Sequence, residues 1–369
     1  MHAQSLLNRA ALVLRKVGPD TPADEALRIE MAARKSWSAV ERRALTRAVY
    51  SYFRWLLWLP EKEAIQAKVD QALSLQDRFE KNEKDIKPQA LAARAVPEWL
   101  AGEMELPVSF LRQLQRQPTL WMRSRKGQEQ QVATSLEDCD VVETAIPGAV
   151  APLKTLRYKG TRDLYRSPDF QAGRFEIQDL ASQAVGLLCN PQPGETWWDT
   201  CAGQGGKTLH LADLMDNKGL LWATDRSKRR LDVLAKRAAR AEVFNYRVAA
   251  WEGEEKLPTK TLFDGILIDA PCSGVGTWQR NPHARWTTSP QDVAELSQVQ
   301  KRLLTHACVA LCEGGRLVYS VCTLTRSETT GVIEAFLRTH PDFTLETATT
   351  LVPGEFDSNG MYIAVLRKK

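Results

Sequence analysis

The sequence lacks the features that place a chain in or across a membrane. Its longest apolar runs are far shorter than the roughly 20 residues needed to span a bilayer. Residues 1–5 have no charged start followed by an apolar core, so we expect no signal peptide. Internal repeats and low-complexity segments are also missing from the sequence.

Cysteine is too sparse for a fold held together by disulfides. The chain has seven cysteines, an odd number, scattered over 369 residues. This usage is typical of a reduced environment. We therefore expect a cytoplasmic protein without a disulfide framework.

The chain also has little excess of either charge. Its formal net charge is +5, and its pI is near 8.8. A mildly basic chain is compatible with a nucleic-acid partner, but a basic enzyme without such a partner would have the same composition. The hydrophobic content of 43% and the charged content of 26% are ordinary for a globular protein, and the length suggests two or three domains.

The first part of the chain, residues 1–95, has helical patterns. Ser38 and Glu41 form a predicted capping box at the start of one helix. Apolar residues then recur at helical spacing, and arginines accompany them, namely Arg42, Arg43, Arg47 and Arg54. These arginines fit either a solvated face beside a core stripe or a surface that contacts phosphates.

The middle of the chain, residues 96–173, mixes short strands and helices. Residues 120–124 and 140–144 are predicted strands, with a polar helix over 127–136 between them. This order predicts a small α+β module.

From about residue 178 the predicted elements alternate. An amphipathic helix over 178–188 leads into the alternation. The predicted strands cover 196–199, 220–225, 246–249, 263–268 and 316–320, with a final edge strand at 361–366. The predicted helices cover 207–215, 227–240, 292–311 and 328–339. Such alternation predicts a doubly wound parallel sheet, with functional loops at the carboxyl ends of its strands.

A glycine-rich turn follows the first of these strands. Its residues run from Cys201 through Ala202, Gly203, Gln204, Gly205 and Gly206 to Lys207 and Thr208. Asp225 ends the next strand about 20 residues later, the spacing at which an acid meets a ribose. The pair predicts an adenosine-containing cofactor, although a glycine turn that merely closes a strand–helix unit is the alternative. It is not a Walker loop, because Cys201 stands where the opening glycine would be.

Two cysteines and a carboxylate follow later strands. Asp269 and Cys272 end the fourth predicted strand, and Cys322 ends the fifth. Neighbouring strand ends lie about 5 Å apart, so we expect both thiols and the carboxylate to face one crevice. The alternatives are buried cysteines that act as small apolar residues, a disulfide, or a metal pair. His306, Cys308 and Cys312 do not form a convincing metal-ligand set, and we interpret Cys308 and Cys312 as packing residues.

A thiol, a carboxylate and an adenosine cofactor together suit methyl transfer to carbon-5 of a pyrimidine. A thiolate that adds to carbon-6 makes carbon-5 nucleophilic, which divides one difficult step into easier ones. A nearby cation favours the thiolate, and Lys207 and Arg326 are the candidates.

With these motifs in order, residues 174–369 resemble the catalytic domain of the Nol/Nop/Sun family of RNA 5-methylcytosine methyltransferases, and the bacterial small-subunit rRNA enzymes most of all. The matching residues are Gln178-Asp179, Ser182-Gln183, the turn 201–208, Asp225, 269–274, 280–282, Arg285-Trp286, Gly314-Gly315 and 319–323.

This resemblance implies a function and a set of roles. It implies a Rossmann-like class I methyltransferase sheet that binds S-adenosyl-L-methionine and methylates RNA, with 16S rRNA as the expected substrate, as a monomer without a metal. Cys322 would be the nucleophile, Cys272 would assist product release, and Asp269 and Lys207 would line the pocket. The turn 201–207, Asp225 and Asp269 would hold the cofactor.

The resemblance also covers the rest of the chain, more weakly. Residues 1–95 are similar to the all-helical NusB-like RNA-binding extension of the bacterial enzymes. Residues 96–173 resemble the small ferredoxin- or RRM-like module that precedes the methyltransferase domain at 174–369. Phosphates would be held by basic residues of the helical extension and by those around Arg280 and Arg285.

Three positions depart from the family pattern. Gly203-Gln204 replaces a commoner Ala-Pro or Gly-Pro, Val321 replaces a threonine, and Trp251 stands where an aspartate usually meets the adenine. The departures at Trp251 and Val321 keep open the alternative of a catalytically weakened RNA-binding assembly factor. A tRNA-directed enzyme of the same chemistry is the other alternative.

Overall fold

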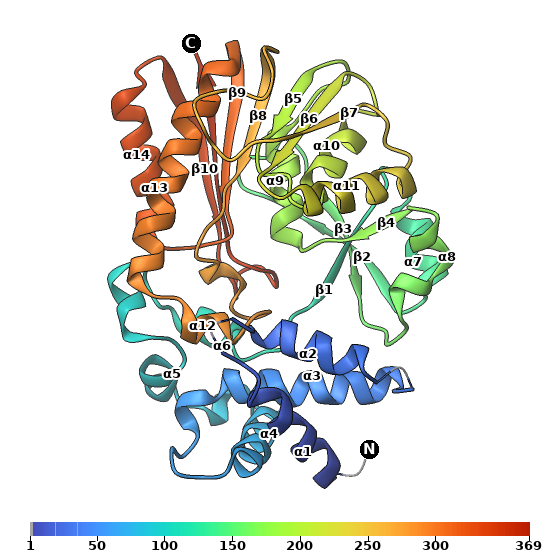
Figure 1. The fold of residues 1–369 in the computed structure, drawn as a ribbon, viewed down its shortest axis with the longest axis vertical. Helices are drawn as coiled ribbons and strands as arrows, with labels where there is room; N and C mark the ends of the chain where they lie inside the picture. The colour runs from blue at the N-terminus through green and yellow to red at the C-terminus, as the bar shows by residue number, and fades with distance from the viewer. Residues whose placement is uncertain (1–2, 19, 35) are drawn as a thin grey trace. The chain divides into compact units, whose positions relative to one another are not determined.

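The computed structural model describes residues 3–18, 20–34 and 36–369, whose contacts form two compact units (Figure 1). The first unit comprises residues 1–118, 274–290 and 352–357. The second comprises residues 119–273, 291–351 and 358–369. Two short segments from the C-terminal half therefore belong to the same unit as the N-terminal helices. The predicted division of the chain at residues 95 and 173 stays a prediction.

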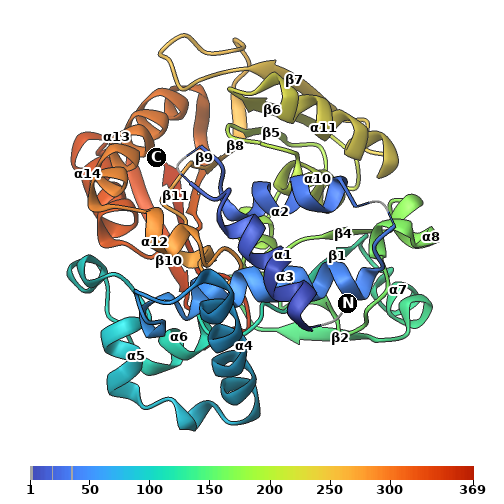
Figure 2. The same cartoon turned by 60° about the horizontal axis from the view of Figure 1, so that its bottom comes forward.

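The first unit is helical, and its helices are drawn in blue to cyan and, for α12, in orange in Figure 2. They are α1 (Ala3–Leu14), α2 (Ala23–Ala32), α3 (Ala39–Arg54), α4 (Ile65–Lys81), α5 (Pro88–Arg94), α6 (Val108–Gln113) and α12 (Ala284–Thr287). The predicted capping box at α3 is confirmed. Ser38 Oγ accepts the Glu41 N–H at 3.3 Å, and the Glu41 carboxylate accepts the Ser38 N–H at 3.0 Å.

The second unit contains a small antiparallel sheet. Its strands are β1 (Leu120–Ser124), β2 (Cys139–Thr144), β3 (Leu153–Tyr158) and β4 (Phe175–Ile177), in the order β2-β3-β1-β4. Helices α7 (Glu129–Leu136) and α8 (Pro168–Gln171) accompany it. The first two predicted strands and the helix between them are confirmed.

The larger sheet has seven strands in the order β10-β11-β9-β8-β5-β6-β7. They are β5 (Thr196–Asp199), β6 (Leu220–Asp225), β7 (Tyr246–Ala250), β8 (Phe263–Asp269), β9 (Leu311–Val321), β10 (Phe343–Leu351) and β11 (Met361–Lys368). Strands β5 to β9 run parallel, whereas β11 is antiparallel to both β9 and β10. The Rossmann-like prediction is confirmed, but the sheet is mixed rather than wholly parallel.

Five helices flank this sheet, and Figure 1 shows α13 and α14 on one face and α9 and α10 on the other. The helices are α9 (Leu180–Cys189), α10 (Gly206–Leu214), α11 (Lys228–Arg240), α13 (Pro290–Ala307) and α14 (Thr330–Thr339). Leu304 of α13 and Phe336 of α14 belong to one buried cluster with Ile268 and Tyr319 of the central strands. This packing fixes the ends of β8 and β9, from which the candidate site is built.

Two predictions about this sheet are wrong. Strand β11 was expected at the edge, but it lies between β9 and β10. The helix expected to reach Leu311 ends at Ala307, because Cys308 begins a short 3-10 turn before β9. Within the part of the chain that the structure describes, no helix has the length and apolarity to cross a membrane.

Candidate active site

Two parallel neighbouring strands carry the predicted thiols to one place. Asp269 at the end of β8 pairs in register with Ser320 of β9, so the loops after these strands leave the same edge of the sheet. Cys272 and Cys322 lie in these loops, and their Sγ atoms are 3.3 Å apart. This separation is a contact and exceeds the roughly 2.05 Å of a disulfide bond. The tertiary structure thus brings together two thiols that are 50 residues apart in sequence.

Asp269 is held from two sides beside the thiols. Its Oδ2 atom accepts a hydrogen bond from Lys207 Nζ at 2.7 Å, and its Oδ1 atom accepts one from Ser320 Oγ at 2.9 Å. The carboxylate therefore has one orientation, while its side chain keeps 28% of its exposure and remains accessible.

Lys207 remains cationic in this setting. Burial acts to lower the pKa of Lys207, but the charges of Asp269 and Cys322 and the hydrogen bond to Asp269 raise that pKa above its ordinary value. A permanent ammonium beside a thiol favours the thiolate. Lys207, one of the two cations predicted for this role, thus contacts Asp269 directly.

The glycine-rich turn lies between β5 and α10. Gly203 and Gly205 have φ of +55° and +85°, which favours glycine at both positions. A Cβ at Gly205 would lie 2.6 Å from Leu234 of α11, whereas a Cβ at Gly203 would meet no atom within 4 Å. The turn therefore packs on α11 through Gly205 and leaves space at Gly203, beside the first N–H groups of α10.

Asp225 closes the other side of this turn from the end of β6. Its Oδ2 atom accepts the Gly203 N–H at 3.0 Å, and its Oδ1 atom accepts the Ser227 N–H at 2.8 Å. Each carboxylate oxygen has a second lone pair, so Asp225 can still accept hydroxyl donors.

A cavity of about 460 Å³ opens at the end of the neighbouring strand β7, and Trp251, Glu252 and Glu254 are among its lining residues. Ala250, which also lines the cavity, pairs in register with Asp225. Glycine turn, acid and cavity thus occur together at one sheet edge, and these residues fit a nucleoside-containing cofactor.

Two polar groups next to the glycine-rich turn in sequence, Asp199 and Cys201, are buried. Burial raises the pKa of Asp199 to about 7, although the Thr208 hydroxyl donates to its Oδ2 atom at 2.7 Å. Burial also raises the pKa of the Cys201 thiol to about 12, so Cys201 stays protonated at neutral pH and is unsuited to be a nucleophile. The remaining predicted residues, Ala202, Gln204 and Gly206, contribute backbone to the turn.

Comparison with known proteins assigns the fold to a family. A family model described as 16S rRNA methyltransferase RsmB/F matches residues 186–367. A protein of Synechocystis sp. described as a probable ribosomal RNA small subunit methyltransferase B is 34% identical over 292 residues, which is 73% of this chain and 64% of that protein. The ribosomal RNA small subunit methyltransferase B of Sodalis glossinidius is 30% identical over 299 residues, which is 78% of this chain and 66% of that protein.

The chain is thus similar to methyltransferases of the Nol/Nop/Sun family. It matches just under two thirds of the length of these two relatives. Among solved structures, a methyltransferase homolog protein from Pyrococcus horikoshii is 26% identical, with a TM-score of 0.59 over 71% of this chain and 90% of that chain. NSun6 from the same organism, solved with SFG, is 27% identical, with a TM-score of 0.52 over 59% of this chain and 60% of that chain.

Two of the departures from the Nol/Nop/Sun pattern, Val321 and Trp251, are buried side chains. Val321 is fully buried in the sheet. Trp251 is 2% exposed, its ring centroid lies 4.8 Å from that of Trp198, and its Nε1 donates to the Glu254 carbonyl at 3.1 Å. Both side chains replace polar family residues with apolar packing.

One predicted phosphate contact is wrong. Arg285 of α12 is fully buried in the helical unit. Its guanidinium donates to the Ala95 carbonyl at 2.9 Å and the Leu114 carbonyl at 2.8 Å, which are the C-caps of α5 and α6. Arg285 therefore satisfies helix-end carbonyls. Arg280 is exposed and remains available.

The arginines of α3 are also largely engaged within the helical unit. Arg42 donates to the carbonyls of residues 31, 34 and 37, and Arg47 pairs with Asp77 and Glu80. Arg54 is 2% exposed. For these three residues the structure favours an intramolecular role over a phosphate-binding one.

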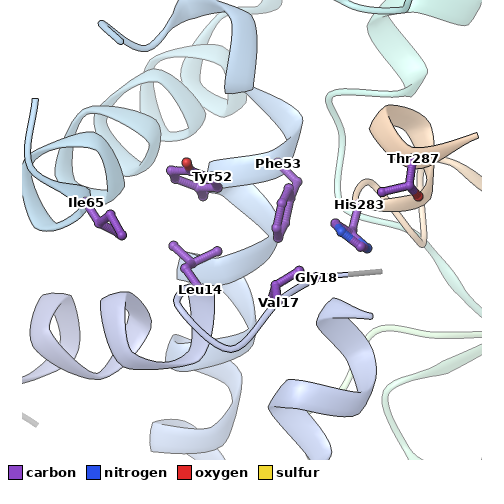
Figure 3. Close-up of a pocket in the computed structure, with 8 residues that line it drawn as sticks. All are labelled: Leu14, Val17, Gly18, Tyr52, Phe53, Ile65, His283 and Thr287. Atoms are coloured by element: carbon purple, nitrogen blue, oxygen red, sulfur yellow. The ribbon is translucent and has the colours of Figure 1, made fainter. Parts of the chain in front are cut away.

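The helical unit has an apolar cavity of about 580 Å³ (Figure 3). Figure 3 shows Leu14, Tyr52 and Phe53 around it, and the Phe53 and His283 ring centroids lie 4.7 Å apart. None of the described residues that line it carries a thiol or a carboxylate, so they lack the chemistry of the site described above. Across residues 3–18, 20–34 and 36–369, no three His, Cys, Asp or Glu side chains are grouped to hold a metal ion.

Sequence reasoning gave no role to the polar residues that support the thiols. Ser320, Ser273 and Glu328 bond to Asp269 or to the cysteine loops. Ser320 is a polar residue between the apolar Tyr319 and Val321 at the end of the strand, and this polar position in an apolar run could have been recognised from the sequence. Glu328 appeared only as the first residue of the predicted helix 328–339, and no local signal marked its role.

Proposed function

We propose that the chain is an S-adenosyl-L-methionine-dependent RNA methyltransferase that modifies cytosine at carbon-5 in 16S rRNA. The names of the matched family and of the curated relatives support the substrate and the reaction. The 3.3 Å contact between Cys272 and Cys322, beside Asp269, carries the proposal, because two thiols and a carboxylate suit this chemistry.

The cofactor would be held by the turn 201–207 and Asp225, with Asp269 near its reactive end. A structural relative, NSun6 from Pyrococcus horikoshii, was solved with SFG, an analogue of S-adenosylmethionine. When bound, this cofactor supplies an electrophilic methyl group. The space at Gly203, the second lone pair on each carboxylate oxygen of Asp225 and the cavity at the end of β7 support this assignment.

Cys322 would be the nucleophile. Its sulfur would form a bond to carbon-6 of the cytosine, and the carbon-5–carbon-6 double-bond electrons would make carbon-5 nucleophilic. Lys207 would favour the thiolate of Cys322, because it stays charged next to it. Asp269, oriented by Lys207 and Ser320, would bind the N3/N4 edge of the ring.

Cys272 would assist product release. After methylation the carbon-5 proton must leave, its bonding electrons restore the double bond, and the carbon-6–sulfur electrons return to Cys322. Cys272 lies in contact with the Cys322 sulfur, which suits an acceptor of that proton or a relay for it.

RNA would reach these residues with its target base unpaired or flipped. In a stacked base, the neighbouring bases cover the ring faces from which the Cys322 thiolate would attack carbon-6 and the methyl group would reach carbon-5. The helical unit would contribute to RNA binding through its exposed basic residues, Arg280 among them, in a monomeric enzyme.

The test is methyl transfer by the purified chain to 16S rRNA and to small subunits from a strain lacking the modification, with bulk tRNA as a parallel substrate. Bisulfite sequencing would locate the product. We expect 5-methylcytosine at one position of 16S rRNA. Methylation of tRNA alone would overturn the substrate, and methyl transfer without 5-methylcytosine would overturn the reaction.

A further inference from the structure

A fully buried carboxylate lies beneath the two cysteine loops. Glu328 is 0% exposed and belongs to a 3-10 turn, Arg326–Glu328, that follows β9. It accepts five hydrogen bonds, from the Ser273 N–H at 2.9 Å, Gln300 Nε2 at 2.9 Å, Thr325 Oγ1 at 2.8 Å, Thr323 Oγ1 at 3.3 Å and the Ser273 hydroxyl. These bonds occupy the lone pairs that a carboxylate offers.

The donors flank both thiols. Ser273 follows Cys272, and Thr323 follows Cys322. Gln300 of α13 donates to the carbonyl of Pro271, which precedes Cys272, at 2.9 Å, as well as to Glu328. One carboxylate thus ties together the loops that carry the two sulfur atoms.

The turn that carries Glu328 is itself fixed. The hydroxyl of Tyr319, a fully buried residue of β9, donates to the Glu328 carbonyl at 2.7 Å. Burying a polar group is costly unless it is hydrogen-bonded. Five donors offset that cost only when both loops adopt the observed geometry, so the carboxylate selects this arrangement over others.

We propose that Glu328 is a positioning residue that holds Cys272 and Cys322 in contact, without touching the substrate itself. This inference rests on the proposed function for its catalytic consequence. Reacting groups must be held to within about 0.5 Å of their productive geometry. Loops from two strands reach this precision here through a shared buried acceptor.

The experiment compares Glu328→Ala with Glu328→Gln. An amide oxygen can accept from Ser273 N–H and Gln300, and an amide NH₂ can donate to the neighbouring hydroxyls, which rotate to accept. A positioning role therefore predicts that Glu328→Gln retains most activity. Glu328→Ala should lower the single-turnover rate on the order of 100-fold, with KM for RNA unchanged. Glu334→Ala, an exposed acid on α14, is the matched control.

A second measurement reports the spacing of the thiols without any RNA. Phenylarsine oxide bridges two thiols that are in contact, and intact mass with peptide mapping identifies the Cys272–Cys322 bridge. We expect equal bridging in the unmodified chain, Glu328→Gln and Glu334→Ala, and at least a tenfold loss, by our estimate, in Glu328→Ala. Cys272→Ala sets the background from the other cysteines.

The outcomes separate the two proposals. Full bridging and full activity in Glu328→Ala would overturn the positioning role and leave the proposed function intact. Loss of activity in Glu328→Gln with bridging intact would also overturn it, in favour of a role for the charge. If the unmodified chain does not methylate RNA, the proposed function is overturned. The phenylarsine oxide assay would still test whether Glu328 holds the Cys272 and Cys322 thiols in contact.

A milder variant covers the case in which Glu328→Ala does not fold. Thr325→Val removes one hydroxyl donor to Glu328 at nearly unchanged volume. We expect partial loss of bridging and of rate in Thr325→Val. If Thr325→Val has the same bridging yield and the same single-turnover rate as Glu334→Ala, the positioning role of Glu328 is contradicted.

Discussion

The Sγ atoms of Cys272 and Cys322 touch at 3.3 Å, although each follows a different strand. This contact requires β8 and β9 to be parallel neighbours whose ends are in register, as the pairing of Asp269 with Ser320 provides. The proposed mechanism gives Cys322 the role of nucleophile and Cys272 a role in product release. Substituting each cysteine alone should therefore distinguish the two roles.

Cys322→Ala should abolish both methyl transfer and the covalent RNA adduct, because in the proposed mechanism Cys272 assists product release and does not attack carbon-6. Cys272→Ala should instead accumulate an adduct that survives a denaturing gel, because the proton acceptor is lost after the bond has formed. Cys312→Ala, half-buried in β9 outside the site, is the control and should behave like the unmodified chain. Full activity of Cys322→Ala would remove the mechanism.

Gly205→Ala should destabilise the glycine turn. The new Cβ would lie 2.6 Å from Leu234, and the φ of +85° disfavours any side chain. We expect a loss of about 1–3 kcal/mol in the free energy of unfolding, together with weaker cofactor binding by calorimetry. Gly206→Ala, whose Cβ would have its nearest contact at 3.9 Å, should leave the melting temperature nearly unchanged. Equal melting temperatures for both variants would contradict this account.

Arg285→Ala should lower the stability of the helical unit rather than weaken RNA binding specifically. It leaves the carbonyls of Ala95 and Leu114 without their donor, and each such buried group costs about 1–3 kcal/mol. Thermal unfolding would measure the loss. Arg280→Ala, at an exposed position, should leave stability unchanged and reduce the salt dependence of RNA binding. The reverse pattern would restore Arg285 as a phosphate contact.

Ionisation of Asp199 should lower the free energy of unfolding as the pH rises from about 4 to about 7. Its carboxyl ionises near pH 4 in the unfolded chain and at about 7 in the folded one, so between these values the folded state keeps a proton that the unfolded state has lost. Stability therefore falls with rising pH across this window, by about 4 kcal/mol in the limit. Below pH 4 both states are protonated and the effect vanishes.

Asp199→Asn removes this titration and should gain stability over the unmodified chain progressively from pH 4 to pH 8. The difference in melting temperature between the two, measured at each pH, cancels the other titrating groups. A difference that does not change with pH would show that Asp199 is ionised throughout.

Local patterns predicted most of the large sheet. Strands β5, β6 and β8 are short, largely apolar runs that each end in an aspartate. Strand β10 was missed because it lies at the sheet edge, where most of its side chains are exposed and no continuous apolar run marks it. Without β10, β11 was wrongly placed at the edge.

The sequence by itself determined the order of the elements, the glycine turn with Asp225, and which thiols and carboxylate are candidates, because strand periodicity, glycine and chemically reactive side chains are local properties. Only the tertiary structure decided that Glu328 ties both cysteine loops, that Trp251 packs in the core, and that Arg285 bonds to helix ends. These outcomes depend on burial and on hydrogen-bond partners from distant parts of the sequence, which no local pattern records.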